Sequence, residues 1–529
     1  MTTGYLLVAL VLFLCILAER WSGKIGMPAL ILFMGVGMLF GCDGLLKIPF
    51  DNYDLAKKVC MACLAFIMFY GGFNTNWKTA KSVAARAILL STVGVLITAG
   101  LTGLFCYYIL HFTYVESFLV GAVLSSTDAA SVFSILRGKS LNLKDGTAPL
   151  LEIESGSNDP ISYLLTLIGI SMLGSEGMGN VGLLVVEEIV LGIFVGVATA
   201  ALAIFLITKH NFVPDGLETI FVIALVAFSF GIADKIGGNT YLSVYLLGII
   251  LGNSPVRHKE IMIPFFDGVT NLAHIIIFFL LGLLALPHQI PQIMLPSCMI
   301  ALVMTFIARP IAVFALLLPF KCSVRQCLLV SWAGLRGAAS VVFAIIVIAS
   351  GGNLSLDLFH IVFMVALLSV AVQGTLIPKA AHVLNMVDDS SDVKKTFNDY
   401  QEESAMTLIR IYIPQGHSWE NKKICEIPLP TGSLALMIKR QGETIIPNGD
   451  MKILAEDSVI LSMPTYETKG NENLKEVTID KKHMWCDRTI QELELPKNQL
   501  IALIKRGDEN VIPRGATMIQ EGDIVVLYQ

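Results

Sequence analysis

The strongest constraint on this chain is a succession of apolar stretches, divided by short polar breaks, that runs from residue 4 to residue 382. Only 15% of the residues are charged and 55% are hydrophobic. A helix needs about 20 residues to cross the hydrocarbon core, and in lipid its backbone groups must be satisfied within the segment. We therefore predict an all-α polytopic membrane protein with about thirteen transmembrane helices, near residues 4–18, 25–41, 55–73, 84–112, 117–138, 148–173, 181–208, 217–235, 238–253, 262–286, 294–319, 325–350 and 357–382.

Basic residues are distributed unequally among the loops between these spans, and an excess of Lys and Arg marks the cytoplasmic side. One set of alternating loops holds Arg20, Lys24, Lys78, Lys81, Arg86, Arg137, Lys139, Lys144, Lys209, Arg257, Lys259, Lys321 and Arg325, and the other holds Lys47, Lys57, Lys58 and Lys235. This asymmetry predicts that the N-terminus lies outside and the C-terminal tail in the cytoplasm. We expect a multi-pass protein of a bacterial inner membrane, with its first helix retained.

Two spans share a short string of small residues. Asp128-Ala-Ala-Ser-Val-Phe133 lies in the fifth span and Gly337-Ala-Ala-Ser-Val-Val-Phe343 in the twelfth. Because the spans are seven apart, the two copies cross the membrane in opposite senses, which is typical of an inverted repeat whose paired discontinuous helices meet near the midplane. The alternative is that small residues recur wherever helices pack closely.

Charged side chains at membrane depth accompany these strings. Asp128 belongs to the first, Arg336 abuts the second, and Glu154 and Asp159 lie on the sixth span. A charge at this depth is costly and is by default a functional residue. Arg336 needs a fixed counter-ion, for which Glu154 and Asp128 are the candidates. With Glu154 in that role, Asp159 is free to exchange a proton for a cation.

Three motifs in this order resemble the monovalent cation:proton antiporter-1 family, which includes the NhaP antiporters and the sodium/proton exchangers. They are Ser126-Thr127-Asp128-Ala129-Ala130, Glu154-Ser-Gly-Ser-Asn-Asp159 and Gly334-Leu-Arg-Gly-Ala338, and the resemblance covers residues 1–385. It implies an NhaA/NhaP-like fold, a homodimer in membrane lipid, and a six-helix core that moves like an elevator.

The resemblance also implies roles for individual residues. The cation would be held by the carboxylates of Asp159 and Asp128, the hydroxyl of Ser155 and the backbone carbonyl of Thr127. Asn158 would brace the unwound crossing, and the Asn158-Asp159 pair implies electroneutral one-for-one exchange. Glu154 and Arg336 would form an ion pair between the sixth and twelfth spans. Arg309, before Pro310 in the eleventh span, has no partner that the sequence identifies.

The chain after residue 385 is more polar. We predict that it forms a linker at 386–404 and two α+β units, at 405–465 and 470–529. The second unit repeats the first at an offset of 66, without gaps. The repeated residues are His417 and His483, Trp419 and Trp485, Leu429-Pro430 and Leu495-Pro496, Ile438-Lys-Arg440 and Ile504-Lys-Arg506, Ile446-Pro447 and Ile512-Pro513, Gly449 and Gly515, Asp457 and Asp523, and Leu461 and Leu527. Short alternating runs bounded by Gly, Pro and Asp predict strands.

Each tail unit resembles the C-terminal domain of the RCK/TrkA type, which implies a cytosolic sensor. Relatives of this kind bind nucleotides such as cyclic di-AMP. The first unit departs from the usual Glu-Gly-Asp turn, with Ala455-Glu456-Asp457 against Glu521-Gly522-Asp523 in the second, which puts ligand binding by the first in doubt. Lys439, Arg440, Lys505 and Arg506 are either phosphate ligands or merely solvated residues at strand ends.

We predict a secondary antiporter that exchanges potassium for protons and is controlled by its tail. Potassium is favoured by the combination of domains alone, and sodium is the alternative. A ligand-gated cation channel is the competing class, but the carbonyl filter string of potassium channels is absent from the sequence. A membrane-anchored sensor would leave Asp128 and Asp159 without a role. Enzymatic, cofactor-binding and nucleic-acid-binding motifs are lacking, and the ten cysteines read as small apolar fillers.

Overall fold

The computed structural model divides the chain into two compact units, Met1–Tyr400 and Gln401–Gln529. We describe each unit by itself. The structure describes residues 2–25, 28–138, 141–173, 181–209, 214, 216–254, 256, 259–352, 354–388, 406–427, 429, 433–440, 443–464, 474–479, 485–486, 488–493, 500–506, 509–511, 513, 515 and 517–528. The predicted linker therefore lies mostly outside the described residues.

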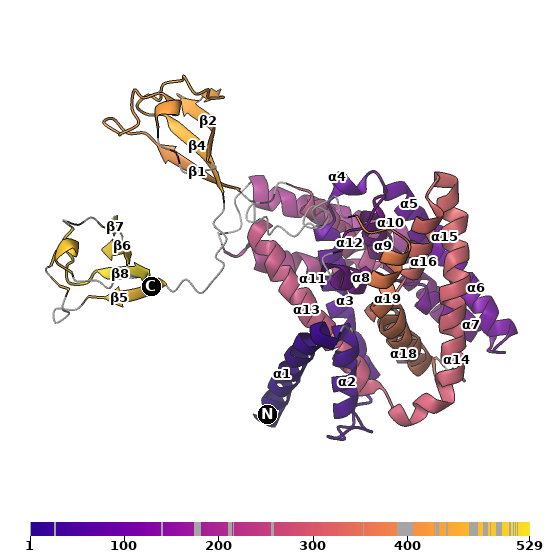
Figure 1. The fold of residues 1–529 in the computed structure, drawn as a ribbon. Helices are drawn as coiled ribbons and strands as arrows, with labels where there is room; N and C mark the ends of the chain where they lie inside the picture. The colour runs from indigo at the N-terminus through magenta and orange to yellow at the C-terminus, as the bar shows by residue number, and fades with distance from the viewer. Residues whose placement is uncertain are drawn as a thin grey trace. The chain divides into compact units, whose positions relative to one another are not determined.

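Every predicted span coincides with a helix or a helix pair, so the prediction of a polytopic helical fold is confirmed (Figure 1). Among the described residues, eight stretches are long and apolar enough to cross a membrane. They are α1 (Thr2–Ile25), α3 (Tyr53–Asn74), α5 and α6 (Ala84–Leu89, Val95–Tyr108), α10 (Val181–Ile204), α11 (Glu218–Ile236), α13 (Lys259–Leu284), α14 and α15 (Ile290–Val303, Arg309–Leu317), and α18 and α19 (Leu358–Leu368, Thr375–Val383). The remaining predicted spans fall on α2 (Ala29–Phe40), α9 (Thr147–Leu173), α12 (Thr240–Gly252) and two broken pairs.

The two broken pairs are α7 with α8 (Tyr114–Leu124, Ala129–Gly138) and α16 with α17 (Val324–Trp332, Ala338–Ala349). The first pair is interrupted at Ser125-Ser126-Thr127-Asp128 and the second at residues 333–337. The backbone N–H of Asp128 donates to the carbonyl of Leu335 over 2.9 Å, so the two breaks lie against each other. The predicted pair of discontinuous helices is therefore present, and its members meet.

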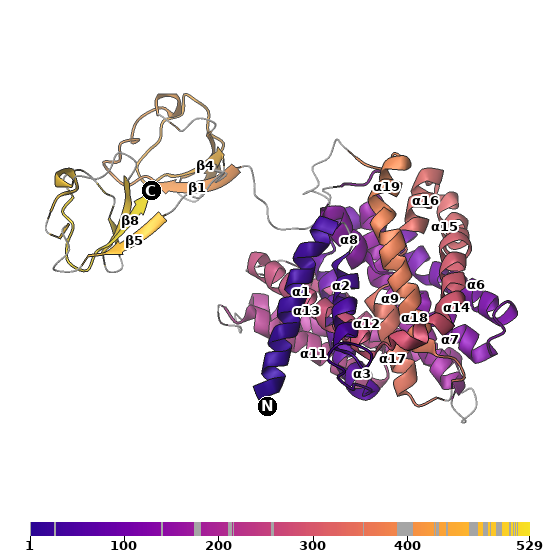
Figure 2. The ribbon, with the colours of Figure 1, turned by 60° about the horizontal axis from the view of Figure 1, so that its bottom comes forward.

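The helices form two groups. In one, α12 packs on α3 and α10, and α13 packs on α2 and α3. A Cβ added at Gly248 would lie 2.2 Å from the carbonyl oxygen of Phe69, so only a glycine lets α12 approach α3 this closely. The other group holds α6 to α9 and α14 to α19, with α7 against α6 and α9, and α14 against α18. Figure 2 shows α19 and α18, in orange, following one another on the side of this unit turned toward the viewer.

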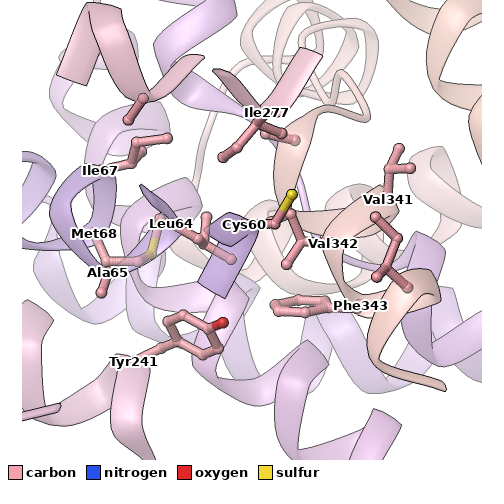
Figure 3. Packing of buried hydrophobic residues seen from close by; sticks show 14 of the residues in the cluster. Cys60, Leu64, Ala65, Ile67, Met68, Tyr241, Ile277, Val341, Val342 and Phe343 are labelled. Carbon is pink, nitrogen blue, oxygen red and sulfur yellow. The ribbon is translucent and has the colours of Figure 1, made fainter. Parts of the chain in front are cut away.

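An apolar core joins the two groups where α17 lies against α3 (Figure 3). Leu64 of α3, Tyr241 of α12 and Phe343 of α17 are fully or almost fully buried there. The ring centroids of Tyr241 and Phe343 are 5.9 Å apart, and those of Tyr241 and Tyr163 of α9 are 4.9 Å apart. Aromatic and aliphatic side chains therefore fill the boundary between the groups.

The tail unit contains two four-stranded antiparallel sheets with the strand orders β1-β4-β2-β3 and β5-β8-β6-β7. The first sheet holds β1 (Met406–Tyr412), β2 (Leu434–Arg440), β3 (Glu443–Ile445) and β4 (Ser458–Pro464). The second holds β5 (Leu474–Thr478), β6 (Leu500–Arg506), β7 (Glu509–Val511) and β8 (Ile524–Tyr528). Even the bulge in β2, between Ala435 and Met437, recurs in β6 between Ile501 and Leu503. The predicted tandem repeat of strand-rich units is confirmed.

Candidate functional site

Asp159 lies in the middle of α9, beside the break between α7 and α8, and only 3% of the residue is exposed. The hydroxyl of Ser126 donates a hydrogen bond to its carboxylate. Pro160 follows directly and lacks an N–H, so the helix loses one internal hydrogen bond at this position. Among the described residues, Asp159 forms no ion pair, and a buried carboxylate without one must be neutralised by a proton or a cation.

Three other predicted site residues meet one turn away. The Ser155 hydroxyl donates to the backbone carbonyl of Thr127 over 2.7 Å and lies 2.9 Å from the Thr127 hydroxyl. The Asn158 amide donates to the same Thr127 hydroxyl, while its own carbonyl oxygen is buried without a partner among the described residues. Asn158 thus ties α9 to the break, and its bracing role stays a prediction. A part for these residues in ion binding stays a prediction.

Asp128 occupies a different position at the same crossing. It caps α8, because its carboxylate accepts hydrogen bonds from the backbone N–H of Ser131 at 3.2 Å and from the Ser131 hydroxyl at 2.6 Å. A Cβ added at Gly337 would lie 2.0 Å from Asp128 Oδ2, so the start of α17 approaches the same carboxylate. Helix N-termini carry partial positive charge, and Asp128 is therefore stabilised by two of them.

The predicted ion pair between Glu154 and Arg336 is wrong in this structure. Glu154 pairs with Arg309 instead: one guanidinium nitrogen lies 2.6 and 2.8 Å from the two carboxylate oxygens. Both side chains are almost fully buried. Arg309 opens α15 after a π-helical turn at Met304–Ala308, and it passes the break at Gly334, where an added Cβ would lie 2.7 Å from its Nε.

This pairing was missed because nothing in the sequence places the eleventh span beside the sixth. The available signal was an arginine inside an apolar span, which requires a counter-ion.

Arg336 bonds to backbone carbonyls, and neither of its predicted carboxylate partners is its ion-pair partner here. Its guanidinium donates to the carbonyls of Ser125 and Ser126 over 3.0 and 2.8 Å. These carbonyls lie at the C-terminal end of α7, which carries partial negative charge. Its backbone N–H donates to Ser369 Oγ over 3.0 Å. Arg336 therefore links the two breaks and, with Arg309, lines a cavity of about 10 Å³, space for roughly one water molecule.

The arginines at the ends of two tail strands, Arg440 and Arg506, each form an ion pair with a buried aspartate. Arg440 donates two hydrogen bonds to the fully buried carboxylate of Asp457, over 2.8 and 2.7 Å, and Arg506 does the same to Asp523, over 2.8 and 2.8 Å. Hydrogen bonds from Arg506, opposed by burial, hold the pKa of Asp523 below its usual range. Both arginines are therefore engaged in ion pairs within their own units, although 28% of the Arg440 side chain and 35% of the Arg506 side chain remain exposed.

In each tail unit the arginine and the aspartate form what we call the clamp, Arg440 with Asp457 and Arg506 with Asp523. The first unit keeps its clamp although its turn departs from Glu-Gly-Asp. Glu456 adopts a φ of +69°, where the second copy has Gly522 at +86°. A residue with a side chain is strained in this region, and glycine is not. The turn keeps its shape at the cost of that strain, so that Asp457 still reaches Arg440.

Several polar residues outside the crossing serve packing. The buried Glu116 accepts hydrogen bonds from the backbone and hydroxyl of both Thr113 and Ser355, and from the backbone of Leu356. It joins the start of α7 to the loop before α18. His274 of α13 lies against the ring of Phe278.

Comparisons with known proteins match both units. The family described as "Sodium/hydrogen exchanger, transmembrane" matches residues 9–381, and the TrkA-C domain matches residues 408–465 and 474–528. The chain is 32% identical over 527 residues to the K(+)/H(+) antiporter NhaP2 of Shewanella sp. (strain MR-4), covering 98% of this chain and 80% of that one. It is 30% identical over 461 residues to the K(+)/H(+) antiporter NhaP of Alkalimonas amylolytica, covering 86% of this chain and 80% of that one.

The fold is also similar to a solved structure. The sodium proton antiporter MjNhaP1 from Methanocaldococcus jannaschii, determined at pH 8, aligns with a TM-score of 0.64 at 24% identity over 73% of this chain and 98% of that one. The chain therefore belongs to the sodium/hydrogen exchanger family, the monovalent cation:proton antiporters, and carries two TrkA-C domains.

Proposed function

We propose that this antiporter exchanges potassium for protons at Asp159. The observation that carries the proposal is a buried carboxylate whose described partner is a neutral hydroxyl, Ser126, beside a cluster of oxygen atoms from Thr127 and Ser155. Oxygen atoms are the ligands of hard monovalent cations, and proton and cation then compete for one carboxylate. The relatives that share both units with this chain are named as K(+)/H(+) antiporters, which supports potassium.

The fixed charges near the site support one-for-one exchange. Glu154 is matched by Arg309, Arg336 by helix carbonyls, and Asp128 by two helix N-termini. Asn158, next to Asp159, carries no charge. Asp159 is then the group whose charge changes during the cycle, and replacing one proton by one potassium ion leaves the loaded site equally charged.

The two helix groups suggest how the site reaches both sides. The group that carries α9 and both broken pairs would move as a unit against the group that contains α3 and α12, as in an elevator. Gly156 of α9 lies against the ring of Tyr245 of α12, where an added Cβ would be 2.7 Å from a ring carbon. This contact lies on the boundary across which the two groups would move. We further propose that the protein is a homodimer in the bacterial inner membrane. Its N-terminus would lie outside, and the ligand of its tail would be a nucleotide.

The test is dissipation of a pH gradient in inside-out vesicles that contain the full chain. Potassium should collapse the gradient with the wild type and not with Asp159→Asn, whereas Asn158→Ala should retain exchange at reduced rate. Sodium in place of potassium tests the alternative substrate. Full activity of Asp159→Asn would show that the site is elsewhere, and current carried without proton movement would favour a channel.

A further inference from the structure

Residues 386–388, the last described residues before the tail strands, are bonded to the loop before α9 by an isolated β-bridge. We call residues 386–388 the exit strand and residues 141–146 the α8–α9 loop. The backbone N–H of Lys144 donates to the carbonyl of Met386, and that of Asp388 donates to the carbonyl of Asn142, each over 2.9 Å. Leu143 and Val387 are therefore partners in an antiparallel bridge.

This bridge is buried. Relative exposure is 2% for Met386, 9% for Val387, 5% for Leu143 and 4% for Asn142. The apolar members of the bridge pack in one cluster with residues of α8, α9, α16 and α19, including Leu136, Leu150, Val330 and Ala381. A displacement of the exit strand therefore cannot be absorbed by loosely packed surface residues.

The α8–α9 loop connects the elements that carry the site. It follows α8, which Asp128 caps, and precedes α9, in which Asp159 lies twelve residues or about 18 Å beyond Thr147. Gln326, at the start of α16, donates its amide to the carbonyl of Asp145 over 3.1 Å and to Thr147 Oγ1 over 3.2 Å. Both broken helix pairs and the Asp159 helix thus meet at this loop.

We propose that the exit strand couples the TrkA-C tail to the transport site. A change in the tail acts on the covalent linker, the linker acts on residues 386–388, and the bridge passes the displacement to the α8–α9 loop and along α9. The proposal rests on the exchange function proposed above. It differs from a mere anchoring role of the bridge, because anchoring would not make transport respond to the state of the tail.

The experiment is a double-mutant cycle in the full chain, measured as the potassium concentration that gives half-maximal gradient collapse. Arg440→Ala perturbs the tail, because it leaves the buried Asp457 without its partner. Asp388→Pro removes the N–H that bonds to Asn142. Asp388→Ala, which keeps that N–H, is the matched control.

We expect Arg440→Ala to shift the half-maximal concentration about threefold or more in the wild-type and Asp388→Ala backgrounds, and less than about 1.5-fold with Asp388→Pro. Equal shifts in all three backgrounds would overturn the proposal, as would the absence of a shift in the wild-type and Asp388→Ala backgrounds. If the wild type showed no potassium-dependent collapse of the gradient, the proposed function itself would be refuted.

A cross-link provides a second measurement on one preparation. Leu143 and Val387 form a pair without mutual hydrogen bonds, a position with a Cα separation of about 4.5 Å that a disulfide can span. In the Asp388→Pro background, Leu143→Cys with Val387→Cys should restore the response to Arg440→Ala under oxidation and lose it on reduction. The Asp388→Pro chain treated with the same oxidant controls for the native thiols. A cross-link that forms without restoring the response contradicts the proposal.

Discussion

Removing one member of the buried Glu154–Arg309 pair should strongly destabilise the membrane unit. The guanidinium lies 2.6 and 2.8 Å from the carboxylate oxygens, and both side chains are nearly inaccessible. Loss of either partner leaves an uncompensated buried charge, which costs about 3–5 kcal/mol. We therefore expect Glu154→Gln and Arg309→Met each to lower the free energy of unfolding by that amount. At about 2 °C per kcal/mol, the melting temperature falls by about 6–10 °C.

The double variant separates this pair from the one that the sequence suggests. Glu154→Gln with Arg309→Met removes both charges, so the double variant should be no less stable than either single variant, which corresponds to a coupling energy of at least about 3–5 kcal/mol. Glu154→Gln with Arg336→Met should be additive within about 0.5 kcal/mol, because Arg336 bonds to the carbonyls of Ser125 and Ser126.

The assay is thermal unfolding of the purified full chain in one detergent, with all five variants measured in parallel. Tryptophan fluorescence or the fluorescence of a fused reporter follows the transition. Stronger coupling of Glu154 to Arg336 than to Arg309 would refute the pairing.

Further predictions follow from other contacts. Gly337→Ala should raise the half-maximal potassium concentration about tenfold, because its Cβ would lie 2.0 Å from Asp128 Oδ2, whereas Gly100→Ala, with open space around it, should have no effect in the same vesicle assay. Arg440→Ala and Arg506→Ala should increase proteolysis of their own tail units to a similar extent, and the lysine variants should recover only part of the protection, since a lysine cannot reproduce two parallel bonds. The pKa of Asp523 is lowered in the folded tail, so its stabilising contribution is present above the unfolded value of about 3.9 and is lost as pH falls through the folded value. Hydrogen exchange of β6, corrected for intrinsic rates, should therefore rise below about pH 4 in the wild type, and this pH dependence should be weaker in Asp523→Asn.

The sequence was sufficient for features that repeat or have a required length. A bilayer sets the length of each span, so the spans could be located from apolar runs alone. The two Ala-Ala-Ser-Val strings lie at the starts of α8 and α17, just after the breaks. In the tail, the offset of 66 relates the clamp of Arg440 and Asp457 to that of Arg506 and Asp523.

Features that depend on the lateral arrangement of helices could not be derived in this way. Arg309, which pairs with Glu154, directly follows a π-helical turn at Met304–Ala308, and no residue pattern marks that turn. The bridge of Leu143 with Val387 involves too few residues to give an alternating pattern, and its partners are far apart in the chain. The strain at Glu456 likewise follows from a turn whose shape is imposed by the buried Asp457.

The neutral Asn158 beside Asp159 has a consequence for energetics. Moving one elementary charge across 100 mV is worth about 2.3 kcal/mol, so a carrier that moved net charge would be driven by the membrane voltage. Under the proposed one-for-one exchange the antiporter moves none, and it would come to rest when the potassium ratio across the membrane equals the proton ratio. Each pH unit of gradient then sustains a tenfold potassium gradient, whatever the voltage.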